Sequence, residues 1–355
     1  MSNNCLDKGK RVKDLVSAVR QDVYLPQTSK DFQNCQAKIG DLLAGSLATS
    51  TENRYFLSFE NFAKFCKNNG IPSLPSEPEV IMTYFVKLSE ENKSAASVLM
   101  ARSAIKHYNL LHKPDNISPT DRADVAMLVK SIERKYSKPV SKRLPTTKLL
   151  VKKYIDKLLD SDQLRIYNFK KSIENWQFVA KTVLKFYCFA RFEEVQVLKI
   201  SNFKFLSSGD LQVTFCKGKN NQFHEPFVTI ISKGNDLLYC PVNIIRKYLS
   251  ILKSTSEDCY FLPKIVKDVP IFTECISYSY SSRKLKEVLT LVGEDPSRYG
   301  EHSDRIGGLS EAANNGCSLY DLQRQGRWKS EYCPKIYHNR SLSIKRKVSD
   351  MLNEL

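Results

Sequence analysis

The chain has 355 residues, of which 42% are hydrophobic, and its formal net charge at neutral pH is +17. This length allows two ordinary domains, and the hydrophobic share excludes a wholly disordered polypeptide. A folded chain this basic favours polyanionic partners, with nucleic acid as the first candidate and an anionic membrane surface as the second.

Membrane insertion and secretion are not expected. The sequence contains no run of about 18 apolar residues that could span a bilayer, and its first residues lack the apolar stretch of a signal peptide. The ten cysteines lie far apart and form no C-x-x-C pair. We therefore expect reduced thiols in an intracellular protein, with neither a disulfide framework nor a zinc site.

The N-terminal region, residues 1–45, is polar and weakly patterned, and we expect it to be an arm. Over residues 46–136, apolar side chains recur at helical spacing in four stretches that are separated by turn residues. Four helices of this length predict a compact all-α domain whose aromatic side chains form the core. The stretches are 51–69, 81–88, 94–112 and 120–136.

A basic, proline-containing segment, KYSKPVSKRLP, follows this domain. Proline favours extended backbone, so we predict a linker over residues 137–147. The linker is either a solvated tether or a strap that crosses a phosphate backbone. The residues that would contact DNA in the second case are Lys135, Lys138, Lys142 and Arg143.

A second domain is predicted over residues 148–355. It opens with helical patterns, and the apolar period then changes to two over 211–215 and 227–231. This change predicts a β-hairpin with lysines in its loop or at a strand end. Helices are expected again from about residue 241 to the end, so the predicted fold class is mainly α with a small β-sheet.

Side chains suited to phosphoryl chemistry recur in the second half of the chain. Each has an ordinary explanation when taken singly, such as a surface ion pair, a helix cap or core packing. Their order along the chain is what makes them informative. The set is Arg191, Glu194, Lys217, His302, Arg305, Trp328 and Tyr337.

Taken together, this set resembles the pattern of the tyrosine recombinase (phage integrase) family. That pattern is an arginine with a glutamate three residues later, a hairpin lysine, H-x-x-R, a histidine or tryptophan, and a tyrosine nine residues further on. The order is complete here, and the surrounding segments ARFEEVQVLKISNF, KGKNNQFHEPFVTI and LQRQGRWKSE are similar too. The resemblance covers the catalytic domain, and it implies that the four-helix region is a SAM-like core-binding domain.

The resemblance implies an enzyme that cleaves and rejoins strands of double-stranded DNA without a metal, a cofactor or ATP. Tyr337 would be the nucleophile and would form a 3′-phosphotyrosyl bond. Arg191 and Arg305 would hold the non-bridging oxygens, because guanidinium groups give planar, bidentate hydrogen bonds to phosphate. These two cations would take the place of the metal ions that other phosphoryl-transfer enzymes use.

The remaining residues of the set would move protons or shape the pocket. The resemblance implies that His302 aids proton removal from the nucleophile and that Glu194 supports the pocket. Trp328 would donate its indole N–H to a phosphate oxygen. Lys217 would protonate the leaving 5′ oxygen, and Lys219 is the rival for that role and a further DNA contact.

The sequence departs from the family pattern at two places. Asp304 stands where a hydrophobic residue usually precedes the second arginine, and a carboxylate there is able to compete for a basic partner. Arg305 is followed by Ile-Gly-Gly, a variation similar to recombinases of crypton-like and DIRS-like mobile elements of eukaryotes. This branch implies a nuclear protein encoded by a mobile element.

The end of the chain carries an apolar stripe over residues 344–355. It packs either on its own domain or on a neighbouring protomer of a tetramer on DNA. Two other functions stay open: a type IB topoisomerase and a catalytically silent DNA-binding relic. The eukaryotic topoisomerases of that type carry S-K-x-x-Y at the nucleophile, where this chain has CPKIY, and relics usually lose catalytic residues.

Overall fold

The computed structural model describes most of the chain between residues 46 and 335, along with residues 29–32, 34, 35, 38 and 42. The described range 46–335 excludes residues 92, 113–116, 138–141, 160–168, 217–225, 254–255, 268 and 333. The chain divides into two compact units, Met1–Val140 and Ser141–Leu355. The fold is mainly α with a small β-sheet, which confirms the predicted fold class. None of the helices described is long and apolar enough to cross a membrane.

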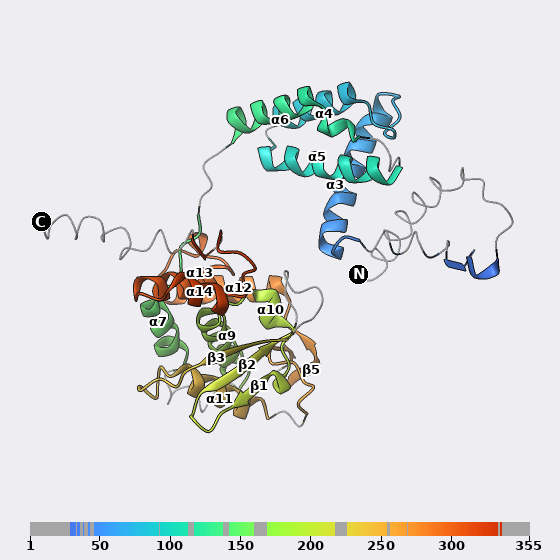
Figure 1. The fold of residues 1–355 in the computed structure, drawn as a ribbon. Coiled ribbons are helices and arrows are strands. Elements are labelled where there is room, and N and C mark those ends of the chain that lie inside the picture. The colour runs from blue at the N-terminus through green and yellow to red at the C-terminus, as the bar shows by residue number, and fades with distance from the viewer. Residues whose placement is uncertain are drawn as a thin grey trace, which may run out of the picture. The chain divides into compact units, whose positions relative to one another are not determined.

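The first unit is helical throughout its regular described part (Figure 1). Phe59 stacks on Tyr108 with ring centroids 4.3 Å apart, and Phe62 packs at a tilt against Tyr84. These rings join three of the helices into one aromatic core, as the helical spacing predicts. The elements are α3 (Thr49–Asn68), α4 (Pro78–Glu90), α5 (Ala95–His112), η1 (Pro119–Asp121) and α6 (Ala123–Tyr136).

The second unit is organised around one helix, α9 (Phe169–Tyr187). Several other helices lie around it (Figure 1), and apolar residues on several of its faces are buried. This central position matters for function because the chain leaves the end of α9 directly into the predicted site. The neighbouring helices are α7 (Lys148–Leu159), α11 (Pro241–Leu252), α12 (Tyr278–Leu291) and α13 (Ser303–Asn314).

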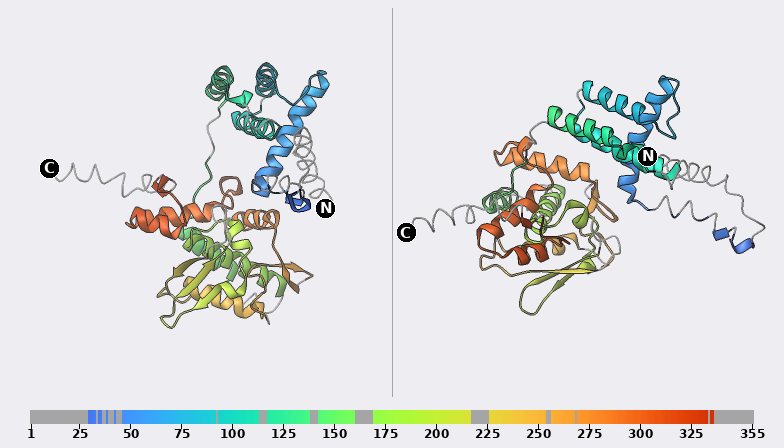
Figure 2. Two further views of the ribbon diagram at one scale, coloured as in Figure 1. Left: turned by 45° about the vertical axis from the view of Figure 1, so that its right-hand side comes forward. Right: turned by 45° about the horizontal axis from the view of Figure 1, so that its top comes forward.

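An antiparallel sheet of three strands lies to one side of these helices (Figure 2). The strands β1 (Phe203–Phe205), β2 (Leu211–Phe215) and β3 (Phe227–Ile231) are paired in that order. Side chains alternate between buried and half-buried along β2, as the apolar period of two predicts. Phe215 pairs with Phe227, so these two residues flank the segment that carries Lys217 and Lys219, which itself lies outside the described residues.

The expectation that only helices follow residue 241 is wrong. A second hairpin, β4 (Pro263–Val266) and β5 (Val269–Cys275), lies between α11 and α12. Its strands are only partly buried and show no clean alternation, so no period of two marks them in the sequence. Pro263 and Pro270 lie within the strands, and proline is normally evidence against a strand.

Candidate active site

The local structure after α9 explains the spacing of Arg191 and Glu194. Arg191 is the N-cap of the short helix α10 (Phe192–Gln196), and Glu194 is its third residue. The Glu194 carboxylate returns to accept the main-chain amide of Arg191 at 2.9 Å and its Nη1 at 2.7 Å. The bond to the amide is one half of a capping box, which requires this separation of three residues, and the bond to Nη1 fixes the guanidinium locally.

Glu194 is also the centre of a cluster of three arginines. Besides Arg191, it lies 2.9 Å from Nη2 of Arg327 and 3.7 Å from Nη1 of Arg305. Burial by itself would raise the pKa of Glu194, but Arg327, the Arg191 amide and the other two guanidiniums lower it below its ordinary value. Three cations therefore face one carboxylate, and the excess positive charge suits a phosphodiester.

Arg305 extends from the first turn of α13 and is almost fully buried. Its Nη1 donates to the main-chain oxygen of Phe189, and its Nη2 donates to that of Gly326 at 3.1 Å. The guanidinium carbon lies 4.3 Å from the ring centroid of Trp328, a cation–π arrangement. The structure thus places Trp328 against Arg305, and its predicted hydrogen bond to phosphate stays a prediction.

His302 precedes α13 and lies close to the same cluster. Its side chain is exposed and makes no capping hydrogen bond. Partial removal of the ring from water lowers the pKa of His302, nearby Lys185, Arg305 and Arg191 lower it further, and Glu193 opposes this shift. A ring that is neutral near physiological pH is able to accept a proton.

Arg327 belongs to this cluster, although it is not among the residues predicted from the sequence. Its Nη1 donates to the main-chain oxygen of Cys188 at 3.0 Å, and its guanidinium lies 4.2 Å from the Phe215 ring centroid. Arg327 therefore joins Glu194 to the base of the lysine-bearing hairpin. The backbone of Arg327 has a φ of 58°, in the left-handed region. The only feature of the sequence that could have identified Arg327 is its position next to Trp328.

Several predicted site residues cannot be compared with this geometry. Tyr337, Lys217, Lys219 and Lys138 lie outside the described residues, so their roles stay predictions. The other predicted DNA contacts are described. Lys135 lies in the last turn of α6, and both Lys142 and Arg143 are exposed in the extended segment before α7.

Asp304, the departure from the family pattern, is buried with its own partners. Its carboxylate accepts a hydrogen bond from Oγ1 of Thr146 at 2.8 Å and lies 3.0 Å from Nζ of Lys185. The basic partner of the Asp304 carboxylate is therefore Lys185 of α9. Within the described residues, no group of three or more His, Cys, Asp or Glu side chains is placed to hold a metal ion.

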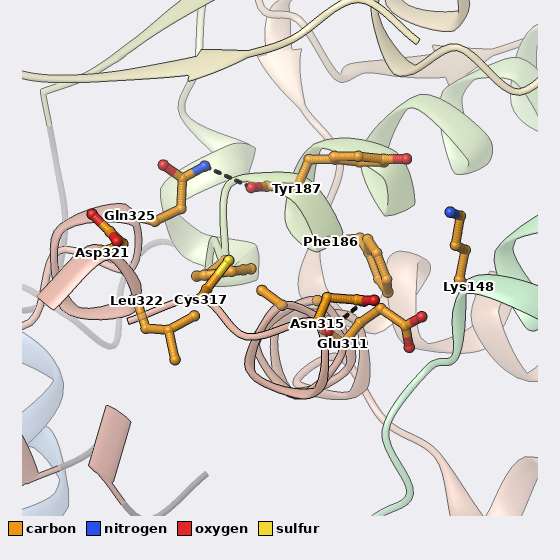
Figure 3. Close-up of a pocket in the computed structure, with 12 residues that line it drawn as sticks. Lys148, Phe186, Tyr187, Glu311, Asn315, Cys317, Asp321, Leu322 and Gln325 are labelled. Atoms are coloured by element: carbon orange, nitrogen blue, oxygen red, sulfur yellow. Dashed lines mark hydrogen bonds between the residues drawn. The ribbon is translucent and has the colours of Figure 1, made fainter. Parts of the chain in front are cut away.

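A cavity of about 370 Å³ lies beside the cluster, between the end of α9, α13 and α14 (Leu319–Gln325). Figure 3 shows Phe186 and Leu322 at its wall, with the carboxylates of Glu311 and Asp321 at its margin. Gln325 closes one side by donating to the main-chain oxygen of Tyr187 at 2.8 Å. The cavity is therefore mostly apolar, and its charged lining residues are Glu311, Asp321 and Lys148.

No family model and no curated protein sequence matches this chain. Several solved protein structures do match this chain. The XerH site-specific recombinase, in a post-cleavage complex with a palindromic difH substrate, matches with a TM-score of 0.63 at 11% identity, covering 98% of this chain and 96% of XerH. The lambda integrase dimer bound to a COC′ core site matches with a TM-score of 0.55 at 16% identity, covering 88% of this chain and 95% of the integrase chain. The Tn1549 transposon integrase with circular intermediate DNA matches with a TM-score of 0.51 at 10% identity, covering 97% of this chain and 98% of the integrase chain. At such low identity these matches establish the fold.

Proposed function

We propose that this chain, which has the fold of the tyrosine recombinases, is a site-specific DNA recombinase or integrase. It would cleave and rejoin DNA strands through a 3′-phosphotyrosyl bond on Tyr337. The observation that carries the proposal is the cluster of Arg191, Arg305 and Arg327 around the buried carboxylate of Glu194. DNA-bound recombinases and integrases among the similar structures support the same activity.

The arginine cluster supplies what the transition state needs. Attack on a phosphodiester places extra negative charge on the non-bridging oxygens, and Arg191 and Arg305 would donate to them. Both guanidiniums are held in advance, Arg191 by Glu194 and Arg305 by two main-chain carbonyls and the Trp328 ring. Donors that are already oriented stabilise the developing charge without reorganising during the reaction.

Proton transfer completes the proposed reaction. A tyrosine hydroxyl has an ordinary pKa of about 10, so it needs a base or a cationic environment to react near neutral pH. His302, whose pKa is lowered by its surroundings, would accept the phenol proton. Lys217 would protonate the departing 5′ oxygen, with Lys219 as the alternative donor.

Covalent capture tests this proposal directly. We would incubate the full chain with sheared DNA from the source genome, denature the mixture, and sequence the DNA that remains attached to protein. Wild type should yield fragments with shared ends, and Tyr337→Phe should yield none because the attacking oxygen is missing. Tyr332→Phe is the matched control, since Tyr332 is exposed and lies on the same segment, and it should behave as wild type.

The same assay separates the other two functions. Salt-sensitive DNA binding without any covalent product from wild type would overturn the recombinase proposal and favour a silent DNA-binding relic. A covalent product with relaxation of supercoiled DNA, but no joining of two duplexes, would favour a type IB topoisomerase. We also propose that a mobile element encodes this chain and that the protein acts in the nucleus.

Assembly into a tetramer on DNA is a further part of the proposal. The apolar stripe of residues 344–355 is accompanied by the basic run Lys345-Arg346-Lys347. A mostly apolar cavity, lined by two carboxylates (Glu311 and Asp321) and one lysine (Lys148), would accept the apolar stripe of such a segment from a second copy. Sedimentation with DNA tests this: a chain ending at residue 342 should lose the tetramer, whereas an unchanged assembly would argue for packing on the same domain.

A further inference from the structure

Helix α13, whose start carries His302 and Arg305, lies very close to two other segments. A Cβ on Gly307 would come within 1.8 Å of the main-chain oxygen of Thr146, and one on Gly308 within 1.9 Å of that of Phe186. Real Cβ atoms do not approach so closely. The two glycines therefore let α13 contact the backbone of the extended segment 142–147 on one side and of α9 on the other.

Asp304 connects α13 to both of these neighbours. Oγ1 of Thr146 donates to its Oδ1 at 2.8 Å, and Nζ of Lys185 on α9 lies 3.0 Å from its Oδ2. The main-chain amide of Thr146 also donates to the oxygen of Ser303 at 3.0 Å. Asp304 and Lys185 are 1% and 0% exposed, so water competes little for these contacts.

A second carboxylate extends the same network to α12. Glu301 accepts hydrogen bonds from Lys185 at 2.6 Å, Lys181 at 3.2 Å and Ser281 at 2.7 Å. Burial opposes the charge on Lys185, but Asp304 and Glu301 raise its pKa above the ordinary value. Two buried lysines thus face two buried carboxylates, although burial lowers the pKa of Lys181, and four separate segments meet at this network.

Buried charge is an inefficient way to stabilise a protein. Apolar side chains of similar volume often give equal or greater stability, because the free energy of removing ions from water offsets much of their attraction. In some proteins, however, the contacts of such ions define how the segments that carry them are oriented. Asp304 lies two residues after His302 and directly before Arg305, so any rotation at Asp304 would move both side chains.

We propose that Asp304 is a positioning residue, which sets the orientation of His302 and Arg305 through Lys185 and Thr146. The inference rests on the proposed function only where strand cleavage is measured. Asp304, which departs from the family pattern, would then support the site rather than compete with it. It also links the site to segment 142–147, which carries the predicted DNA contacts Lys142 and Arg143.

Three variants of the full chain test this inference. Asp304→Asn keeps the shape and an acceptor for Thr146 but removes the anion beside Lys185. Thr146→Val removes only the hydroxyl donor. The double variant Lys185→Met with Asp304→Leu replaces the charge pair by apolar side chains. Lys153→Met is the matched control, because it breaks the exposed ion pair of Lys153 with Glu294 at 3.1 Å in the same unit.

Each protein would be examined in three ways. Thermal unfolding reports stability, and covalent capture with sheared DNA from the source genome reports cleavage. The ring resonances of His302 are followed by NMR on protein with ¹⁵N-labelled histidine, with His302→Gln for assignment. The NMR measurement does not depend on activity, so it separates a failure of this inference from a failure of the proposed function.

We expect Asp304→Asn to displace the His302 resonances and to slow cleavage by about tenfold or more, with DNA binding unchanged. Thr146→Val should act in the same direction with a smaller effect. The double variant should be more stable to heat than Asp304→Asn, but it should not regain the wild-type His302 resonances or the wild-type cleavage rate. Wild-type resonances and cleavage in the double variant would overturn the inference and leave Asp304 with a purely stabilising role. If wild type cleaves no DNA, the proposed function fails, and the His302 resonances alone decide on Asp304.

Discussion

Nη2 of Arg327 lies 2.9 Å from Oε2 of Glu194, although 133 positions separate the two residues. The same carboxylate oxygen accepts the main-chain amide of Arg191. Arg327 also stacks on Phe215 at the base of the lysine-bearing hairpin. One carboxylate therefore holds together the segment after α9 and the segment before Trp328, with the hairpin attached through Arg327.

Removal of Arg327 should destabilise the protein. Arg327→Met would leave the buried Glu194 carboxylate without one of its cations, and we expect a loss of roughly 3 kcal/mol in the free energy of unfolding. Arg327→Lys should recover only part of it, because a lysine keeps the charge but not the stacking on Phe215. Urea unfolding measures both. Arg283→Met, at an exposed pair with Glu287, should cost less than about 1 kcal/mol, and equal losses at the two sites would contradict the prediction.

The ionised state of Glu194 should make stability depend on pH. Its pKa in the folded chain lies below the ordinary value of 4.5. Its charge therefore stabilises the fold fully above that ordinary value and loses this effect as the pH falls through the lower folded pKa. The difference in unfolding free energy between wild type and Glu194→Gln should hold from about pH 7 to about pH 5 and then shrink as the pH falls below the ordinary pKa of 4.5. A difference that stays constant down to the acid limit would show that this carboxylate is not held ionised.

Gly326 should be intolerant of any side chain. A Cβ there would lie 1.7 Å from Cζ3 of Trp328, so Gly326→Ala must displace the ring that stacks on Arg305. We expect a red-shifted Trp328 emission, measured in a Trp176→Phe background, and cleavage slowed by about tenfold. Gly300→Ala serves as the control, because a Cβ on Gly300 would make an ordinary contact at 3.8 Å to the Arg143 side chain. Unchanged emission in Gly326→Ala would mean that Trp328 is not packed in this way.

Arg143 should contribute to DNA binding through charge. Arg143→Gln should weaken binding to all duplexes alike and reduce the slope of log affinity against log salt by about 0.9, the value for one lost phosphate contact. Fluorescence anisotropy over a salt series measures this slope. Lys264→Gln is the control, since Lys264 already pairs with Glu274 at 2.7 Å. A slope unaffected by Arg143→Gln would remove this residue from the DNA contacts.

Much of the architecture could be predicted from the sequence, because the signals are local. Apolar spacing indicated the helices of the first unit and the hairpin of β2 and β3, since periodicity depends only on near neighbours. The contact between Arg191 and Glu194 is local too, because a capping box spans three residues. The hairpin of β4 and β5 was missed because its half-exposed strands carry no such period.

The sequence by itself therefore determined the helical periods, the first hairpin and the list of candidate residues with their order. Only the tertiary structure decided which distant polar and charged side chains meet. Arg327 reaches Glu194 from 133 positions away, and Thr146 reaches Asp304 from 158 positions away. The physical reason is that a buried charge requires a partner in space, and the identity of that partner leaves no mark in the local pattern of either segment.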